Sequence, residues 1–186
     1  MTPDEQLVRH AQKGDLTALE KLLRRYEQSI YAFLVRMLAD PFAAEDAAQE
    51  VLVTVMKQIP RYQERGTFKA WIFTLSHRQG LKALRKRRRG IARFMRPIPG
   101  DLPETGGPSH ETPDQRAMAK EEWRVTEEAL RHLPEAEREV VHLHVVEGLT
   151  FREIADVTGT PLNTTLGRMR NARTRLKKSL TAGERT

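Results

Sequence analysis

Apolar residues recur at every third or fourth position through most of the chain, which is the spacing of one buried stripe along an α-helix. The longest stripe follows Asp15, a candidate N-cap. Its members are Leu16, Leu19, Leu22, Leu23, Tyr26, Ile30, Phe33, Leu34 and Met37. No segment alternates apolar and polar residues in the manner of a half-buried strand. The pattern therefore predicts an all-α protein.

Capping residues divide the first 95 residues into four helices. Each helix begins with a capping side chain, and in two of them a proline takes the first helical position. The four helix starts are Thr2-Pro3-Asp4-Glu5, Asp15, Asp40-Pro41 and Gly66-Thr67. Gly14 ends the first helix, and Pro60 stops the third, which runs to about Gln58. The fourth helix leads from apolar positions into a basic run. We predict a four-helix domain over residues 1–95.

A different composition marks residues 96–117, which hold half of the ten prolines of the chain, several glycines and few apolar residues. Such a segment has little to bury and predicts a flexible linker. A second domain is then expected over residues 118–186. It begins with a helix that follows the capping box Thr112-Pro113-Asp114-Gln115 and runs to about His132, and Pro134 opens another that Gly148 ends.

The last two helices of the chain predict a helix-turn-helix. A capping box, Thr150-Phe151-Arg152-Glu153, opens a short helix to Val157; Gly159 lies in the turn, and a long basic helix runs from about Thr164 to Leu180. We expect its core to contain Val146, Leu149, Ile154, Ala155, Met169, Ala172 and Leu176. A generic helical hairpin has the same apolar pattern. The hydroxyl and guanidinium groups of the last helix favour DNA binding, because they bond phosphates and base edges.

Charge is distributed unevenly along the chain. Lys and Arg number 32 against 25 Asp and Glu, a formal net charge of +7, and the excess lies in the first domain. Residues 78–93 hold eight basic residues and no acid, and residues 168–178 hold six and no acid. A single basic run is often only a solvated helix face. Two acid-free runs, each at the end of an amphipathic helix, favour a polyanionic partner.

Several classes of chemistry are excluded or disfavoured. Without Cys there are no disulfides, no thiolate nucleophiles and no Cys-bound metals. His142 and His144 point to different faces of a helix, so we expect structural roles for them and no metal site. The chain has no phosphate-binding glycine loop and no nucleophile motif, which predicts no enzyme, no cofactor and no small-molecule substrate. No apolar run is long enough for a membrane span or fits a signal peptide, so we expect a cytoplasmic protein without membrane insertion.

Four motifs in order resemble a bacterial RNA polymerase sigma factor of the extracytoplasmic-function (ECF) type. They are Ala44-Glu45-Asp46-Ala47-Ala48-Gln49-Glu50, Phe68-Lys69-Ala70-Trp71-Ile72, Leu130-Arg131-His132-Leu133-Pro134, and Gly148-Leu149-Thr150-Phe151-Arg152-Glu153-Ile154-Ala155. The resemblance spans nearly the whole chain. It implies a non-catalytic subunit that binds core RNA polymerase and promoter DNA, and it also implies an inhibitory anti-sigma factor.

In the first domain, the resemblance implies that Asp46, Gln49 and Glu50 dock on core polymerase. Their spacing places them on one helix face, and acidic groups there suit a basic protein surface, although charges near a helix N-terminus are also favourable on their own. The implied minus-10 DNA site comprises Arg61, Tyr62, Thr67, Phe68, His77, Arg78, Lys82 and Arg85. Tyr62 is the better candidate for stacking on an unpaired base, because Trp71 shares the apolar stripe and is expected in the core.

In the second domain, the resemblance implies minus-35 binding by the last two helices. The candidate residues are Arg152, Thr164, Thr165, Arg168, Arg170 and Arg173. Here Leu166 and Gly167 replace the Lys and Ser that are usual in the family, so its promoter preference does not carry over. His77 and Arg78 likewise stand where the family usually has Arg and Asn.

The predicted function is promoter recognition and transcription initiation with core RNA polymerase. The alternative is a stand-alone helix-turn-helix regulator that acts as a dimer without polymerase, with the first domain used for dimerisation or an effector. Such a regulator requires a self-complementary apolar surface, and the acid-free run at residues 78–93 argues against a first domain used for protein contact alone.

Overall fold

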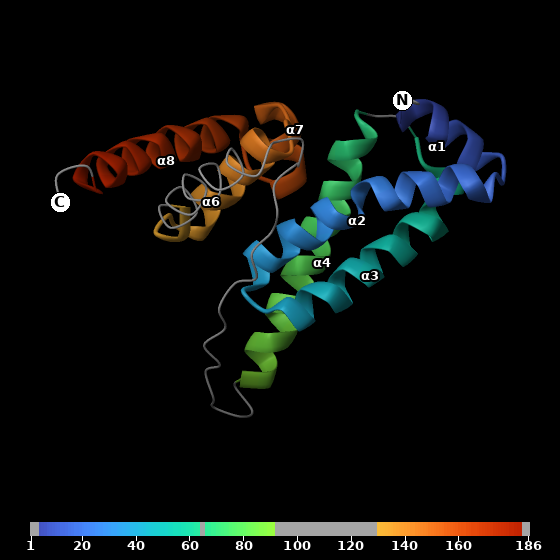
Figure 1. Cartoon of the computed structure of the whole chain (residues 1–186), viewed down its shortest axis with the longest axis horizontal. Helices are drawn as coiled ribbons and strands as arrows, with labels where there is room; N and C mark the ends of the chain where they lie inside the picture. The colour runs from blue at the N-terminus through green and yellow to red at the C-terminus, as the bar shows by residue number, and fades with distance from the viewer. Residues whose placement is uncertain (1–3, 64–65, 92–129, 184–186) are drawn as a thin grey trace, which may run out of the picture. The chain divides into compact units, whose positions relative to one another are not determined.

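The computed structural model describes residues 4–63, 66–91 and 130–183, and every regular element in these ranges is helical (Figure 1). The all-α prediction is confirmed. The helices belong to two units, α1–α4 and α6–α8, and each is described by itself. The segment predicted as a linker, residues 96–117, and nearly all of the helix predicted after it lie outside the described residues. None of the described helices has the length and apolar character needed to cross a bilayer.

Capping side chains begin three of the helices of the first unit as the sequence predicts, and the capping box predicted at Thr2 begins outside the described residues. The elements are α1 (Asp4–Gln12), α2 (Leu16–Leu38), α3 (Pro41–Gln58), a 3-10 turn (Ile59–Arg61) and α4 (Phe68–Ile91). The Asp15 carboxylate accepts a hydrogen bond from the Ala18 amide at 3.0 Å. Asp40 accepts from two amides of the first turn of α3, each at 3.1 Å. Each cap satisfies amides that have no partner within the helix.

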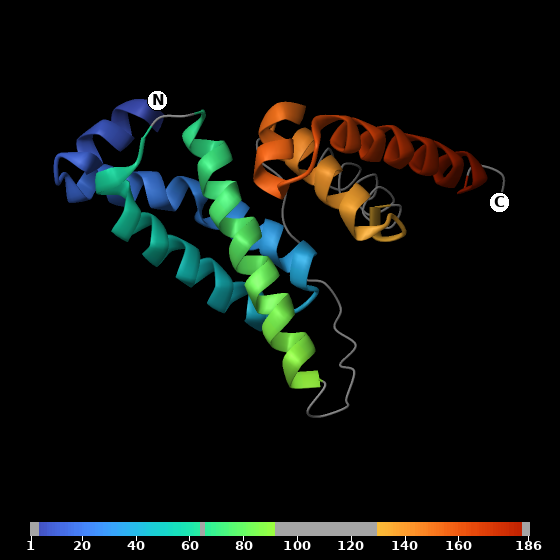
Figure 2. The ribbon, with the colours of Figure 1, turned by 180° about the vertical axis from the view of Figure 1, so that it is seen from behind.

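The core of the first unit lies where α4 crosses the hairpin of α2 and α3 (Figure 2). Its fully buried side chains include Leu22, Ile30, Leu34, Val51, Val55, Ile72 and Phe73. Burial of each contributes about 1.5–3 kcal/mol. The predicted stripe of α2 is largely confirmed, but Leu16 is 76% exposed, because it begins the helix at the edge of the stripe.

A glycine allows α2 and α4 to approach closely. A Cβ added at Gly80 would lie 2.4 Å from Met37 Sδ and 3.2 Å from Leu34 Cδ2. Both distances are shorter than ordinary van der Waals contact. The two helices therefore pack at a separation that leaves no room for a side chain at residue 80.

The first helix of the second unit ends in a widened turn. Helix α6 (Glu135–Val141) continues as a π-helical turn (His142–Val146), and Gly148, with φ 68°, ends it. His142 and Glu147 are both buried, and His142 Nε2 lies 3.5 Å from Glu147 Oε1. A π turn brings residues five apart onto one face. Val146, expected in the core, is 50% exposed, because this turn rotates it outward.

The helix-turn-helix is formed by α7 (Phe151–Thr158) and α8 (Leu162–Gly183); α7 is one continuous helix and is described whole with this unit. The capping box is present, since the Thr150 amide donates to Glu153 Oε2 at 2.9 Å and the Glu153 amide donates to Thr150 Oγ1 at 3.3 Å. Gly159, with φ 64°, makes the turn. The rest of the predicted core is buried, with Leu176 half-buried.

Candidate nucleic-acid and partner interfaces

Helix α4 carries a row of exposed cations. Arg78, Lys82, Arg85 and Arg89 are exposed at spacings of four, three and four residues, which places them on one helix face. We call these four residues the α4 cationic stripe. Arg87, from the same basic run, donates to the Leu38 carbonyl at 3.0 Å and so caps the C-terminal end of α2. The basic run therefore contains the exposed cations of the α4 cationic stripe and also Arg87, which bonds another helix.

Two residues predicted for the minus-10 site are instead buried in the first unit. His77 is buried, because it lies on the side of α4 that faces the helical core, one position before the exposed Arg78. Phe68 is also buried, since it begins α4 among the other aromatic rings. Because both side chains are buried, they do not present the DNA-binding surface that was expected of them from the sequence. The Phe68 ring instead packs against Tyr62 and Trp71, with centroids 5.6 and 5.4 Å away.

Four aromatic rings form a cluster at the start of α4. The Tyr62 ring centroid lies 4.7 Å from that of Trp71 and 5.6 Å from that of Phe68, and Tyr26 lies 5.6 Å from Phe68. Tyr62 and Trp71 are both half-buried. Trp71 therefore contributes to packing, as expected, while it also presents part of its surface beside Tyr62. The cluster holds Tyr62 in a defined orientation at the start of the segment that leads into α4.

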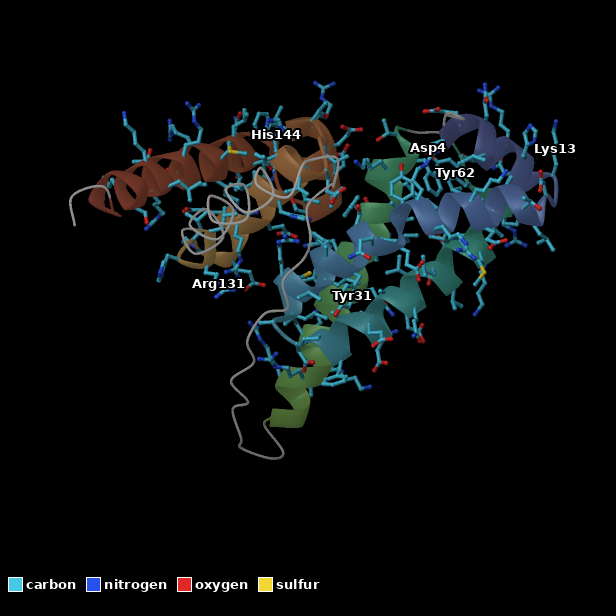
Figure 3. The ribbon with its side chains drawn as sticks, viewed as in Figure 1. Asp4, Lys13, Tyr31, Tyr62, Arg131 and His144 are labelled. Carbon is cyan, nitrogen blue, oxygen red and sulfur yellow. The ribbon has the colours of Figure 1, made fainter. Side chains whose placement is uncertain are left out.

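Helix α1 fixes the backbone next to this cluster. Gln12 Nε2 donates to the Tyr62 carbonyl at 2.8 Å and to the Ile59 carbonyl at 3.2 Å. At the other end of α1, Asp4 accepts hydrogen bonds from Arg25 and Tyr26. Asp4 and Tyr62 lie at the same end of the first unit (Figure 3). The sequence pattern did not indicate Gln12, because its partners are 47 and 50 residues away and no motif links them.

The remaining residues predicted for the minus-10 site are exposed. Arg61 and Thr67 lie on either side of the segment between the 3-10 turn and α4. Thr67 Oγ1 accepts from the Ala70 amide at 3.2 Å and so caps α4. A shallow pocket beside this segment is lined by Glu5, Val8, Arg9, Gln12, Tyr62 and Phe68. The pocket thus has one cation, Arg9, one acid, Glu5, and two aromatic rings in its lining.

An acidic surface lies on α3. Asp46, Gln49 and Glu50 are all exposed, and we call these three residues the α3 acidic face. Three exposed apolar side chains of the same helix extend this surface, namely Phe42, Val53 and Met56. Phe42 is 83% exposed. An acidic face beside exposed apolar groups is typical of a protein-binding surface and unfavourable for DNA.

The helix-turn-helix presents some of its predicted DNA-binding groups and buries another. Thr164, Arg170, Arg173 and the Arg152 side chain of α7 are exposed. Thr165 is fully buried, and its hydroxyl lies 3.1 Å from Thr160 Oγ1. The prediction that Thr165 faces a DNA groove is wrong, because this residue lies on the same side of α8 as the buried core and links α8 to the turn.

Arg168 has an electrostatic partner inside the second unit. It is half-buried, and its charge acts on the Glu139 carboxylate of α6. Arg175 similarly pairs with Glu137 through Nε and Oε2 at 3.1 Å. The basic run of α8 is thus divided between a side that faces α6 and a side that faces outward.

The two histidines of this unit have intramolecular contacts. His144 Nδ1 lies 2.9 Å from the Leu149 carbonyl, and its ring stacks on Phe151 with centroids 4.3 Å apart. His142 lies beside Glu147, as described above. Within residues 4–63, 66–91 and 130–183, no group of three or more His, Asp or Glu side chains is placed to hold a metal ion.

Glu139 is expected to make the second unit less stable at high pH. Burial raises the pKa of its carboxyl from 4.5 to about 7, the Arg168 charge opposes this shift and Glu135 adds to it. The folded state therefore binds the proton more tightly than the unfolded state, and this contribution to stability is lost as the pH rises through 7. We expect the free energy of unfolding to fall by about 1–2 kcal/mol between pH 5.5 and pH 8.

Thermal unfolding of the full chain, followed through NMR signals of α8 at several pH values, measures this effect. Glu139→Gln removes the titrating group and keeps its size, so the variant should show a smaller change over the same range. An unaltered pH profile in Glu139→Gln would assign the change to another group.

Two family models match the chain in the order of the two units. The sigma-70 region 2 model matches residues 22–90, and the sigma-70 region 4 model matches residues 124–176. The ECF RNA polymerase sigma factor RpoE of Cereibacter sphaeroides is 32% identical, over 89% of this chain and 88% of that protein. The RNA polymerase sigma-H factor of Pseudomonas aeruginosa is 28% identical, over 95% of this chain and 93% of that protein.

Two solved structures are similar in fold to this chain. The sigma factor RpoE of Bartonella quintana, solved in complex with the anti-sigma factor NepR, aligns with a TM-score of 0.70 at 21% identity, over 87% of this chain and 96% of that chain. CnrH, solved with the cytosolic domain of CnrY, aligns with a TM-score of 0.64 at 21% identity, over 96% of this chain and 97% of that chain. At these identities the similarity establishes the fold.

Proposed function

Because this chain belongs to the ECF sigma factors of RNA polymerase, we propose a division of that function among the surfaces described above. As a member of this family it binds core RNA polymerase and directs promoter recognition and transcription initiation. The observation that carries this conclusion is the presence of both sigma-70 regions, 2 and 4, in one chain, together with a 32% identical ECF relative matched over nearly all of its length. We propose that it supplies no catalytic group of its own to the reaction.

We assign polymerase binding to the α3 acidic face. Asp46, Gln49 and Glu50 are exposed on one side of α3, beside a strongly basic helix that is suited to DNA. The exposed Val53 and Met56 would gain apolar burial in the same contact. A basic surface with an apolar centre on the core enzyme is the expected partner.

We assign minus-10 recognition to the start of α4 and to the α4 cationic stripe. Tyr62, held by Trp71 and by the hydrogen bond from Gln12, is placed to stack on an unpaired base beside Arg61 and Thr67. Arg78, Lys82 and Arg85 are placed to neutralise the phosphates that follow along the strand.

We assign minus-35 recognition to the outward side of the helix-turn-helix, through Arg152, Thr164, Arg170 and Arg173. Arg168 contributes less, because it also interacts with Glu139. Accordingly, we divide the chain into a polymerase and minus-10 domain over residues 1–95, a linker over residues 96–117 and a minus-35 domain over residues 118–186.

We further propose that the protein acts in the cytoplasm under an anti-sigma factor. One solved neighbour named above is a sigma factor in complex with the anti-sigma factor NepR, and the other, CnrH, was solved with the cytosolic domain of CnrY. An inhibitor that covers the α3 acidic face would block polymerase binding before any DNA contact is made.

A run-off transcription assay tests the function directly. The purified chain, added to bacterial core RNA polymerase with fragments of the source genome, should produce discrete transcripts that core polymerase alone does not produce. Gel filtration of the same samples should show the chain eluting with core polymerase. A dimer that ignores polymerase and still binds DNA would instead support the stand-alone regulator.

A further inference from the structure

Gly167 lies inside α8, and nothing in the part of the protein that the structure describes explains a glycine there. Glycine is among the least favourable residues in a helix interior. The backbone of Gly167 is helical and lacks the positive φ of Gly148 and Gly159. A Cβ added at Gly167 would meet no described atom within 4 Å, in contrast to Gly80, where Met37 leaves no space. Neither backbone conformation nor internal packing in the described residues requires this glycine.

Gly167 lies in the middle of the outward face of α8. The buried residues Thr165, Met169 and Ala172 define the side of α8 that faces the core of the unit. On a helix with 3.6 residues per turn, residue 167 lies on the opposite side from residues 165 and 169. Asn163 and Asn171, four residues before and after it, occupy the same row, and both are exposed. Asn163, Gly167 and Asn171 therefore follow one another along this face of α8.

Two short amide side chains flank the gap that the glycine leaves. An Asn side chain can pair with an adenine through its N6 and N7 atoms in the major groove. Because Asn is short, it reaches a base edge only if the helix backbone comes close to the groove. Any side chain at residue 167 would stand between the two amides and hold the helix away from the DNA.

We propose that Gly167 determines promoter specificity, by letting the backbone of α8 approach the major groove closely enough for Asn163 and Asn171 to read adenines of the upstream element. This inference rests on the proposed function, since it takes α8 as the helix that enters DNA. The inference adds Asn163 and Asn171 to the residues predicted for the minus-35 site. It also gives a role to Gly167, which stands where the family usually has Ser. The exposed Leu166 and Arg170 flank the same approach.

Gly167→Ala tests the inference, because stability and DNA binding should change in opposite directions. Alanine favours the helix, so the melting temperature should rise by about 2–5 °C. The added methyl group should weaken binding of the holoenzyme to its best upstream sequence about 10-fold, and Gly167→Leu should weaken it more. Binding-site selection from random upstream sequence should give adenine at one or more positions with the wild-type chain, and less adenine preference with Gly167→Ala. Replacing those adenines by 7-deazaadenine, which lacks the N7 acceptor, should weaken only wild-type binding.

Ser179→Ala is the matched control. Ser179 is exposed about three turns beyond Gly167 and on a different side of α8, and alanine there also favours the helix but adds no atoms near the gap. This variant should gain stability and keep its affinity and base preference. Unchanged affinity and base preference in Gly167→Ala and Gly167→Leu would overturn the inference. Run-off transcription by the same holoenzymes reports the proposed function separately, and wild-type chain that supports no transcription would overturn both.

Discussion

Reversing the charges of the α3 acidic face, with Asp46→Lys and Glu50→Lys together, is expected to weaken binding to core RNA polymerase at least about 100-fold. Two attractions to a basic surface become two repulsions, and like charges placed together at an interface cost several kcal/mol. Run-off transcription should fall in parallel, because a factor that does not bind polymerase cannot direct it to a promoter. Titration of fluorescently labelled chain with core polymerase measures the dissociation constant.

A control with the same change in net charge separates a specific contact from a general electrostatic effect. Glu20→Lys with Glu27→Lys alters two exposed carboxylates of α2 by the same amount. This variant should bind core polymerase within a few fold of wild type. Full core affinity in the Asp46 and Glu50 variant, with normal melting behaviour, would show that polymerase binds elsewhere.

Removing three cations of the α4 cationic stripe should reduce promoter affinity and its salt dependence together. If the holoenzyme engages six to ten phosphates, its affinity for promoter DNA should fall about 10³- to 10⁵-fold between 50 and 200 mM salt. For Arg78→Ala, Lys82→Ala and Arg85→Ala combined, the slope of log affinity against log salt should be smaller by about 3. At 0.1 M salt the same loss corresponds to about 100- to 1,000-fold weaker binding.

A control variant removes three cations of the same unit that lie outside the α4 cationic stripe. Lys13→Ala, Lys21→Ala and Arg24→Ala remove an equal charge from α2 and the turn before it, and should leave the slope nearly unchanged. Arg87→Ala should lower stability more than affinity, because its guanidinium caps the end of α2. A flat salt response of the wild-type holoenzyme would contradict phosphate binding by this surface.

Local sequence signals predicted most of the described architecture. Asp15, Asp40 and Thr150 cap the helices that their positions predict, since a cap depends on residues two or three apart in sequence. The turn at Gly159 is likewise a local feature, in which φ must be positive. The resemblance to ECF sigma factors was confirmed by the matches to both sigma-70 regions.

The site residues that were predicted incorrectly are ones whose direction on the helix, toward the core or toward solvent, the sequence did not determine. Thr165 and His77 carry polar groups near exposed cations, yet each faces the interior, and the composition of a short motif does not determine the direction of a side chain. The π turn at His142 shifted Val146 outward, and no sequence pattern marks such a turn. Gln12 was missed because its hydrogen bonds join segments that only tertiary packing brings together.

The tight contact at Gly80 has a mechanical consequence. Because the Met37 and Leu34 side chains of α2 lie directly against Gly80 of α4, and Arg87 of α4 bonds the Leu38 carbonyl at the end of α2, the two helices cannot slide past one another without losing both contacts. α3 is packed against both of them. The surface proposed for core polymerase, on α3, and the surface proposed for DNA, on α4, therefore belong to one packed unit. If both assignments hold, a protein that binds α3 also fixes the orientation of the α4 cationic stripe.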